Sequence, residues 1–196
     1  MNHIIRKIQK KKLNIDVISN SRDAVNLTKW GNLYISQPSS DVSQDFSFFT
    51  FYFKDSSVRV DSYDIISFDG DVYPTNWTLS VSDDNKNWIE IDRKDQPLCN
   101  PSYIEYKQIE KRYLCALKET FHFTLSAKRN EFYKYVKFQM LKNSYYSVDN
   151  WYDQFTFYGF ELNGNFFVPY KGIPTCKCHK INLIKLSSLI IVSLIS

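Results

Sequence analysis

A strand–turn–strand pattern in the middle of the chain limits the folds that the chain can adopt. Apolar and polar side chains alternate along Trp77–Ser82, the polar run Asp83–Asn87 follows, and the alternation resumes in Trp88–Ile91. Alternation with a period of two on both sides of a short polar turn is the pattern of a β-hairpin with one buried face. We therefore predict a hairpin, with Trp77 and Trp88 close together on its inner face.

Further strands are predicted on both sides of this hairpin. Asp45–Phe53 and Phe155–Leu162 carry apolar side chains on both faces, which is typical of strands packed on both sides. Five other segments are strand-like: Asn14–Ser19, Leu33–Ser36, Val58–Ser67, His122–Leu125 and Tyr135–Leu141. Many short strands without regular strand–helix alternation indicate an all-β fold, an antiparallel sandwich or barrel. Aromatic residues, 17% of the chain, can fill its core.

One segment departs from the strand pattern. Tyr106, Ile109, Tyr113 and Leu117 follow one another at spacings of three, four and four residues. Such spacing places side chains on one face of a helix. Within Ser102–Lys118 we therefore expect a short helix or a structured insertion.

The charge of the chain is unevenly distributed. Met1–Lys12 carries a charge of +5 and Phe167–Ser196 one of +4, whereas Leu13–Phe166 carries −5, for a net charge of +4. We expect three parts: a basic helical lead-in at residues 1–12, one globular domain at residues 13–166, and a basic, then apolar tail at residues 167–196. Nucleic-acid binding requires a basic groove, so the acidic domain predicts no nucleic-acid partner.

The ends of the chain and its cysteines give expectations about location. The apolar stretch Leu186–Ser196 has 11 residues, whereas a membrane-spanning helix needs roughly 20. We predict a non-spanning tail and keep a membrane anchor as the alternative. The first twelve residues lack the apolar stretch of a secretory signal. We therefore expect a cytoplasmic protein whose cysteines are reduced thiols: Cys99, Cys115, Cys176 and Cys178.

Four segments, taken in order, resemble the discoidin domain, also called the coagulation factor 5/8 type C domain. They are F-Y-F-K-D-S-S-V-R-V-D-S-Y-D-I-I-S from Phe51, N-W-T-L-S-V-S-D-D-N-K-N-W-I-E-I-D from Asn76, Y-K-Y-V-K-F-Q-M from Tyr133 and G-F-E-L from Gly159. The resemblance covers Ile15–Asn165 and is nearest to the intracellular type found in protist proteins and beside BTB-type adaptor domains. It implies a galactose-binding-like jelly-roll sandwich that binds ligands through loops at one end.

Three loops carry the side chains that such a site would use. Aromatic rings can stack on the apolar C–H face of a sugar, and Asp and Asn oxygens can accept hydrogen bonds from paired hydroxyl groups. The expected ligand-binding residues are Trp30, Tyr34, Asp69, Asp71, Tyr73, Tyr145, Tyr146, Asp149, Asn150 and Trp151. The alternative is that these rings only cover the open end of the sandwich.

Neither a metal nor a cofactor is predicted. Asp69-Gly70-Asp71 offers two carboxylates, whereas Ca²⁺ takes six or more oxygen ligands. Cys176-Lys177-Cys178-His179 resembles half of a zinc site, but no second ligand pair follows. The chain also lacks the nucleophile-elbow, phosphate-loop and zinc-protease motifs, so we do not expect an enzyme.

These observations predict a non-catalytic binding module that recognises a glycan or protein ligand through the loops at one end. The first alternative is a scaffold module of a cytosolic adaptor. The second is a peripheral module that binds phospholipid membranes. The sequence leaves the oligomeric state and the identity of the ligand open.

Overall fold

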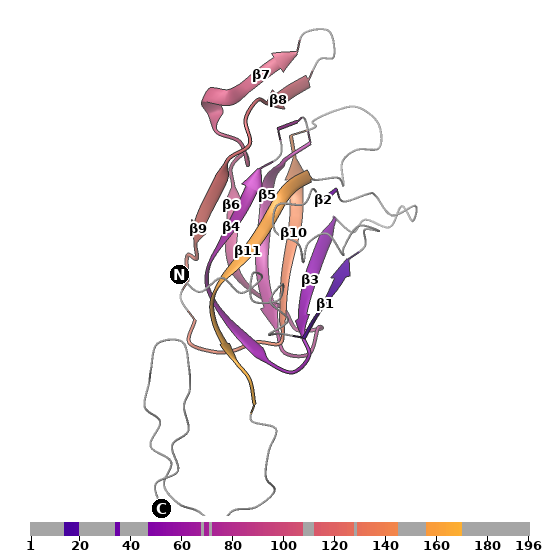
Figure 1. Cartoon of the computed structure of the whole chain (residues 1–196), viewed down its shortest axis with the longest axis vertical. Coiled ribbons are helices and arrows are strands. Elements are labelled where there is room, and N and C mark those ends of the chain that lie inside the picture. Colours follow the sequence, from indigo (N-terminus) through magenta and orange to yellow (C-terminus); the bar gives the residue numbers. More distant parts are fainter. Residues whose placement is uncertain are drawn as a thin grey trace, which may run out of the picture.

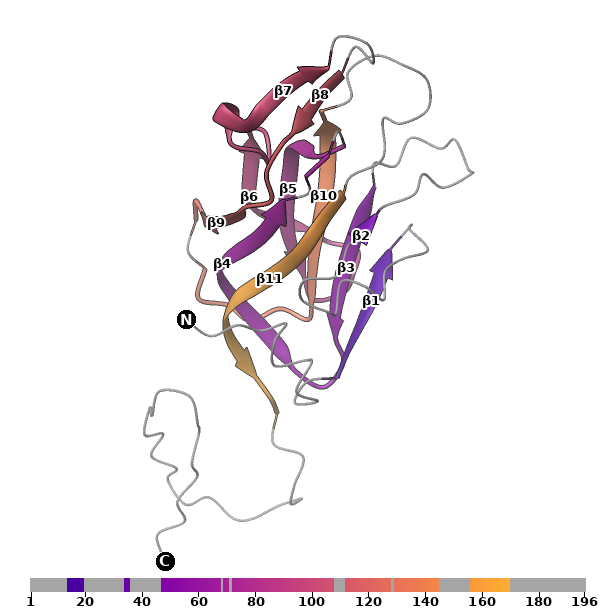
Figure 2. The same ribbon diagram turned by 45° about the horizontal axis from the view of Figure 1, so that its top comes forward.

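The computed structural model describes residues 14–19, 34–35, 47–67, 69–70, 72–107, 112–127, 129–144 and 156–169. Their strands form two facing antiparallel sheets and a separate hairpin beyond one end of both (Figures 1 and 2). The five-stranded sheet has the order β1 (Ile15–Ser19), β3 (Phe48–Phe53), β10 (Tyr135–Asn143), β5 (Pro74–Ser82) and β6 (Ile89–Asp95). The four-stranded sheet has the order β2 (Tyr34–Ile35), β11 (Thr156–Phe167), β4 (Ser57–Ser67) and β9 (Thr120–Thr124). The hairpin pairs β7 (Ile104–Lys107) with β8 (Arg112–Cys115) after a 3-10 turn at Pro101–Tyr103.

Aromatic side chains fill the space between the two sheets. Phe49 of β3 is fully buried, with its ring stacked on that of Phe138 at 5.1 Å between centroids. It also meets the ring of Phe160, from the opposite sheet, edge to face at 5.0 Å. Burying each such side chain contributes about 1.5–3 kcal/mol, so these contacts hold the two layers together. The fold is the antiparallel jelly-roll sandwich that the sequence predicts.

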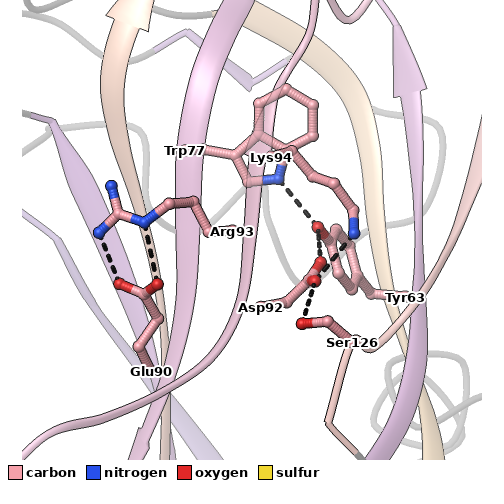
Figure 3. Close-up of polar contacts among 7 residues, drawn as sticks. All are labelled: Tyr63, Trp77, Glu90, Asp92, Arg93, Lys94 and Ser126. Carbon is pink, nitrogen blue, oxygen red and sulfur yellow. Dashed lines mark hydrogen bonds and ion pairs between the residues drawn. The ribbon is translucent and has the colours of Figure 1, made fainter.

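A hydrogen-bonded row crosses this core (Figure 3). The Trp77 indole Nε1 donates to the Tyr63 hydroxyl at 2.9 Å, and that hydroxyl donates to Asp92 Oδ2 at 2.8 Å. Asp92 Oδ1 accepts from Lys94 Nζ at 2.8 Å and from the Ser126 hydroxyl at 3.3 Å. Burial, together with the nearby Asp92 carboxylate, raises the pKa of Tyr63 far above its ordinary value. Tyr63 belongs to the four-stranded sheet and Trp77 to the five-stranded sheet, so the row joins the layers.

The predicted strands are present, with small changes in their bounds. The central hairpin is β5 and β6, and the predicted strand Asp45–Phe53 begins later, as β3 at Phe48. The predicted strand Phe155–Leu162 continues further, as β11 to Phe167. The lead-in at residues 1–12 lies outside the described residues, as does Leu186–Ser196. Within the described part of the chain, no helix has the length and apolar character needed to cross a membrane.

Of the two alternatives for Ser102–Lys118, the short helix is wrong and the structured insertion is confirmed. The segment contains the β7–β8 hairpin, in which Tyr106 pairs with Tyr113. Tyr106 is 53% exposed and Leu117 46% exposed, so their helix-like spacing does not mark a buried face.

Reduced thiols are also the wrong expectation for Cys99 and Cys115, which form a disulfide across the base of the hairpin with a Cα–Cα distance of 5.8 Å. Cys176 and Cys178 lie outside the described residues.

The expected partnership of Trp77 and Trp88 is wrong too. Trp77 is fully buried in the core, but Trp88 is half-buried on the outer side of the five-stranded sheet. There it meets the ring of Tyr135 at 6.5 Å and the ammonium group of Lys137 at 4.3 Å. Those two residues flank the fully buried Val136 on β10, so they point away from the core. Strand β6 begins at Ile89, and Trp88 therefore belongs to the turn and not to the alternating strand.

The disulfide should stabilise the hairpin end of the molecule. Exchanging both cysteines, Cys99→Ser with Cys115→Ser, should lower the free energy of unfolding by up to about 3 kcal/mol, because the bond closes a loop with a sequence separation of 16. Thermal unfolding with and without reductant measures this. Reductant should lower the midpoint of the wild type and leave that of the double variant unchanged. Equal midpoints for the oxidised wild type and the double variant would show that this disulfide does not stabilise the protein.

The buried row should matter more than an exposed ion pair close by. Asp92→Ala leaves the Tyr63 hydroxyl and Lys94 without their acceptor, and should lower the free energy of unfolding by about 2–4 kcal/mol. The matched control is Glu90→Ala, which breaks the two hydrogen bonds from Arg93 seen in Figure 3. That pair is exposed, so its loss should cost less than about 1 kcal/mol. Denaturant unfolding measures the free energy of unfolding of both variants. Equal losses in Asp92→Ala and Glu90→Ala would show that the buried row contributes no more than the exposed ion pair.

Candidate functional site

The candidate site lies at the end of the sandwich that carries the hairpin. Backbone hydrogen bonds join the segment after β4 to three other elements there. Gly70 O accepts from Cys115 N at 2.8 Å, Val72 O from Thr156 N at 3.0 Å, and Tyr73 O from Ser144 N at 2.9 Å. The starts of β5 and β11 and the ends of β4, β8 and β10 are thereby held together. We call this region the loop end.

A β-bulge places an aromatic ring at the loop end. The register of β11 on β4 shifts between Phe157 and Gly159, which leaves Tyr158 as the extra residue. Bulges re-aim a side chain relative to its strand. The Tyr158 hydroxyl forms a hydrogen bond with the Asp69 carboxylate, and this bond is the main reason that the pKa of Tyr158 is raised. The Lys118 ammonium lies 3.7 Å from the centre of the Tyr158 ring.

These three side chains offer distinct kinds of contact in one place. Tyr158 supplies a ring face, Asp69 a hydrogen-bond acceptor and Lys118 a hydrogen-bond donor. Tyr158 is half-buried, while Asp69 and Lys118 are exposed. A half-exposed ring with a carboxylate and an ammonium group beside it can hold a small polyhydroxylated ligand. Among the described residues, no group of three or more His, Cys, Asp or Glu side chains could hold a metal ion.

The structure describes three of the predicted ligand-binding residues. Asp69 lies in the cluster just described. Tyr34 pairs with Phe157 in the backbone ladder between β2 and β11, one residue from Tyr158. Tyr73 is only 3% exposed and packs against the disulfide, so its ring supports the loop end from inside. The remaining predicted residues lie outside the described residues: Trp30, Asp71, Tyr145, Tyr146, Asp149, Asn150 and Trp151.

Two residues of the cluster were not among the predicted site residues. The run F-T-F-Y-G-F from Phe155 breaks the period of two, because two aromatic residues stand side by side before Gly159. A break of this kind next to glycine is a signal of a bulge, and it could have identified Tyr158. For Lys118 we find no signal in the sequence, since its place depends on the path of the chain after the hairpin.

Comparison with known proteins reveals a likeness of fold. No family model matches the sequence, and no curated protein matches it either. The C-terminal domain of a chitobiase from Bacteroides fragilis superposes with a TM-score of 0.50 at 12% identity, over 84% of this chain and 99% of that one. CBM32-3 from a family 31 glycoside hydrolase of Clostridium perfringens has a TM-score of 0.48 at 15% identity, over 77% and 91% of the two chains.

A third solved structure is the CBM32 of AlyQ in complex with 4,5-unsaturated mannuronic acid. It has a TM-score of 0.46 at 13% identity, over 77% of this chain and 96% of that one. At such low identities a likeness shows the fold alone. The fold is the galactose-binding-like jelly-roll sandwich.

The contact between Tyr158 and Asp69 should be visible in solution. Asp69→Asn removes the negative charge that favours the protonated phenol, so the pKa of Tyr158 should fall towards its ordinary value of about 10. Carbon-13 NMR of ring-labelled tyrosine over a pH titration measures this. Asp95→Asn, a change at an exposed carboxylate on β6, is the control and should leave Tyr158 unaffected. A Tyr158 pKa that is the same in the wild type and in Asp69→Asn would exclude the contact.

Proposed function

We propose that this chain is a non-catalytic module that binds a glycan at the loop end. The observation that carries the proposal is the cluster of Tyr158, Asp69 and Lys118 at the end of a galactose-binding-like sandwich. Loops at the end of a rigid sandwich commonly carry binding residues, because the strands fix their positions. Here the hydrogen bonds of Gly70, Val72 and Tyr73 fix the loop end.

The contacts suggest how a sugar would be held. The C–H face of a sugar ring carries partial positive charge, so it can pack on the electron-rich face of the Tyr158 ring, as the Lys118 ammonium does in the free protein. Asp69 would accept hydrogen bonds from hydroxyl groups, and Lys118 would donate to a sugar oxygen. We propose that some of the predicted residues outside the described part of the chain, Trp30 and Trp151 among them, also contact the sugar.

The finer assignments remain proposals. Membership of the discoidin family, of the intracellular type, depends on the four sequence segments that resemble it. The cytoplasmic location also stays a prediction, and the Cys99–Cys115 disulfide counts against it, because disulfides form and persist in oxidising compartments. Within the described residues, the scaffold and phospholipid alternatives have no comparable cluster in their favour.

Removal of the ring should abolish most of the binding. We expect NMR titration with the methyl glycosides of galactose and N-acetylglucosamine to shift the amide signals of Tyr158, Asp69 and Lys118. Tyr158→Ala should weaken binding at least about tenfold, which corresponds to about 1.4 kcal/mol. The matched control is Tyr106→Ala, since that tyrosine is exposed on the hairpin and outside the cluster. Shifts absent with both sugars, or an equal loss in both variants, would refute the loop-end site.

A further inference from the structure

A second cleft lies at the opposite end of the sandwich. Strand β5 leaves the loop end and runs for nine residues, about 26 Å at roughly 3.3 Å per residue, to the turn that leads into β6. Beside this turn is an open cavity of about 380 Å³. The residues that line it come from the turn, the adjoining strands and the segment before β10: Ser82, Asp83, Asp84, Lys86, Asn87, Trp88, Ile89 and Tyr133. Its size is that of a small ligand pocket.

The Trp88 ring is held in place from the side of the sheet. Tyr135 meets it edge to face at 6.5 Å, and Lys137 Nζ lies 4.3 Å from its centre. Tyr135 is itself stacked on Tyr52 at 4.6 Å, with only 7° between the ring planes. Neither Tyr135 nor Lys137 lines the cavity, whereas Trp88 does. The indole is therefore supported on one side and borders the cleft on another.

The turn itself is rigid before any ligand arrives. The Asp84 carboxylate accepts hydrogen bonds from Lys86 N at 2.9 Å, from Asn87 N at 2.8 Å and from Asn87 Nδ2 at 2.7 Å. These donors hold the pKa of Asp84 well below its usual range, the backbone N–H of Asn87 contributing most. The Ser82 hydroxyl also donates to Asp84, at 3.0 Å. A site built on such a turn loses little conformational entropy when it binds.

The chemistry of the lining favours a neutral, hydroxyl-rich ligand. Asp83 can accept hydrogen bonds, Lys86 can donate them, and the amide of Asn87 can do both. Hydroxyl groups both donate and accept hydrogen bonds, so this mixture of donors and acceptors suits them. The indole ring of Trp88, which lines the same cavity, can pack against the apolar C–H groups of a sugar.

We propose that the cleft beside Trp88 is a second saccharide site, separate from the loop end. The ligand class rests on the proposed function, but the two sites share no residue and are about the length of β5 apart. A chain with a saccharide site at each end can hold two sugar units at once, and its avidity for a multivalent glycan would exceed the affinity of either site.

NMR titration of each variant separates the two sites. The probes are the methyl glycosides of galactose and N-acetylglucosamine, added to the full chain. In the wild type and in Tyr158→Ala, either sugar should shift the amide signals of Asn87, Trp88 and Ile89. Trp88→Ala should weaken this binding at least about tenfold, and Trp88→Phe, which keeps a ring, should restore most of it. Native mass spectrometry of the wild type should show two bound sugars.

A control away from the cleft guards against general damage to the fold. Tyr106→Ala removes an exposed ring from the hairpin at the other end of the sandwich, so it should keep the shifts at Asn87. Equal losses in Tyr106→Ala and Trp88→Ala would overturn the second site.

The pattern of shifts then distinguishes the proposals. Shifts at the loop end alone would overturn the second site and support the first, and shifts beside Trp88 alone would do the reverse. Shifts at both ends support both sites, and shifts at neither end overturn both.

Discussion

The structure depends on one row of buried hydrogen bonds inside an aromatic core. Trp77, Tyr63 and Asp92 come from both sheets, and each can pair only if the sheets face one another in a single register. A slip by one residue would turn these side chains to the outer face and leave polar groups unpaired inside the core, at a cost of about 1–3 kcal/mol each. Packed rings alone tolerate more rearrangement, so the polar row makes the alignment of the two layers specific.

That alignment decides what lies at each end of the sandwich. Because β4 and β5 are held in opposite sheets, the segment between them crosses the loop end and carries Asp69 next to the bulge at Tyr158. The same strand β5 delivers the turn before Trp88 to the other end. Both candidate sites combine an aromatic ring with polar side chains on backbone that other hydrogen bonds hold in place. If both proposals hold, the sandwich serves as a scaffold, and only a few side chains at each end contact the sugar.

The strands could be predicted from the sequence because alternation reports which face of a strand is buried. The hairpin at Ser102–Lys118 could not, since three of the four β7 residues are exposed and show no alternation of buried and exposed side chains, and since the disulfide at its base was not expected. The position of Trp88 on the outer side of the sheet could not be predicted, because the alternation of apolar and polar residues does not show at which residue a turn ends and the next strand begins. Asp69 could be predicted from its loop, whereas Lys118 comes close to Tyr158 only through tertiary packing.

The central claim is that a sugar packs on the Tyr158 ring at the loop end. The most direct measurement is a set of intermolecular nuclear Overhauser effects between a bound methyl glycoside of galactose and ring-labelled tyrosine. The account predicts cross-peaks that join the C–H protons on one face of the sugar to the ring protons of Tyr158. Cross-peaks from a bound sugar to other tyrosines alone, with none to Tyr158, would contradict it.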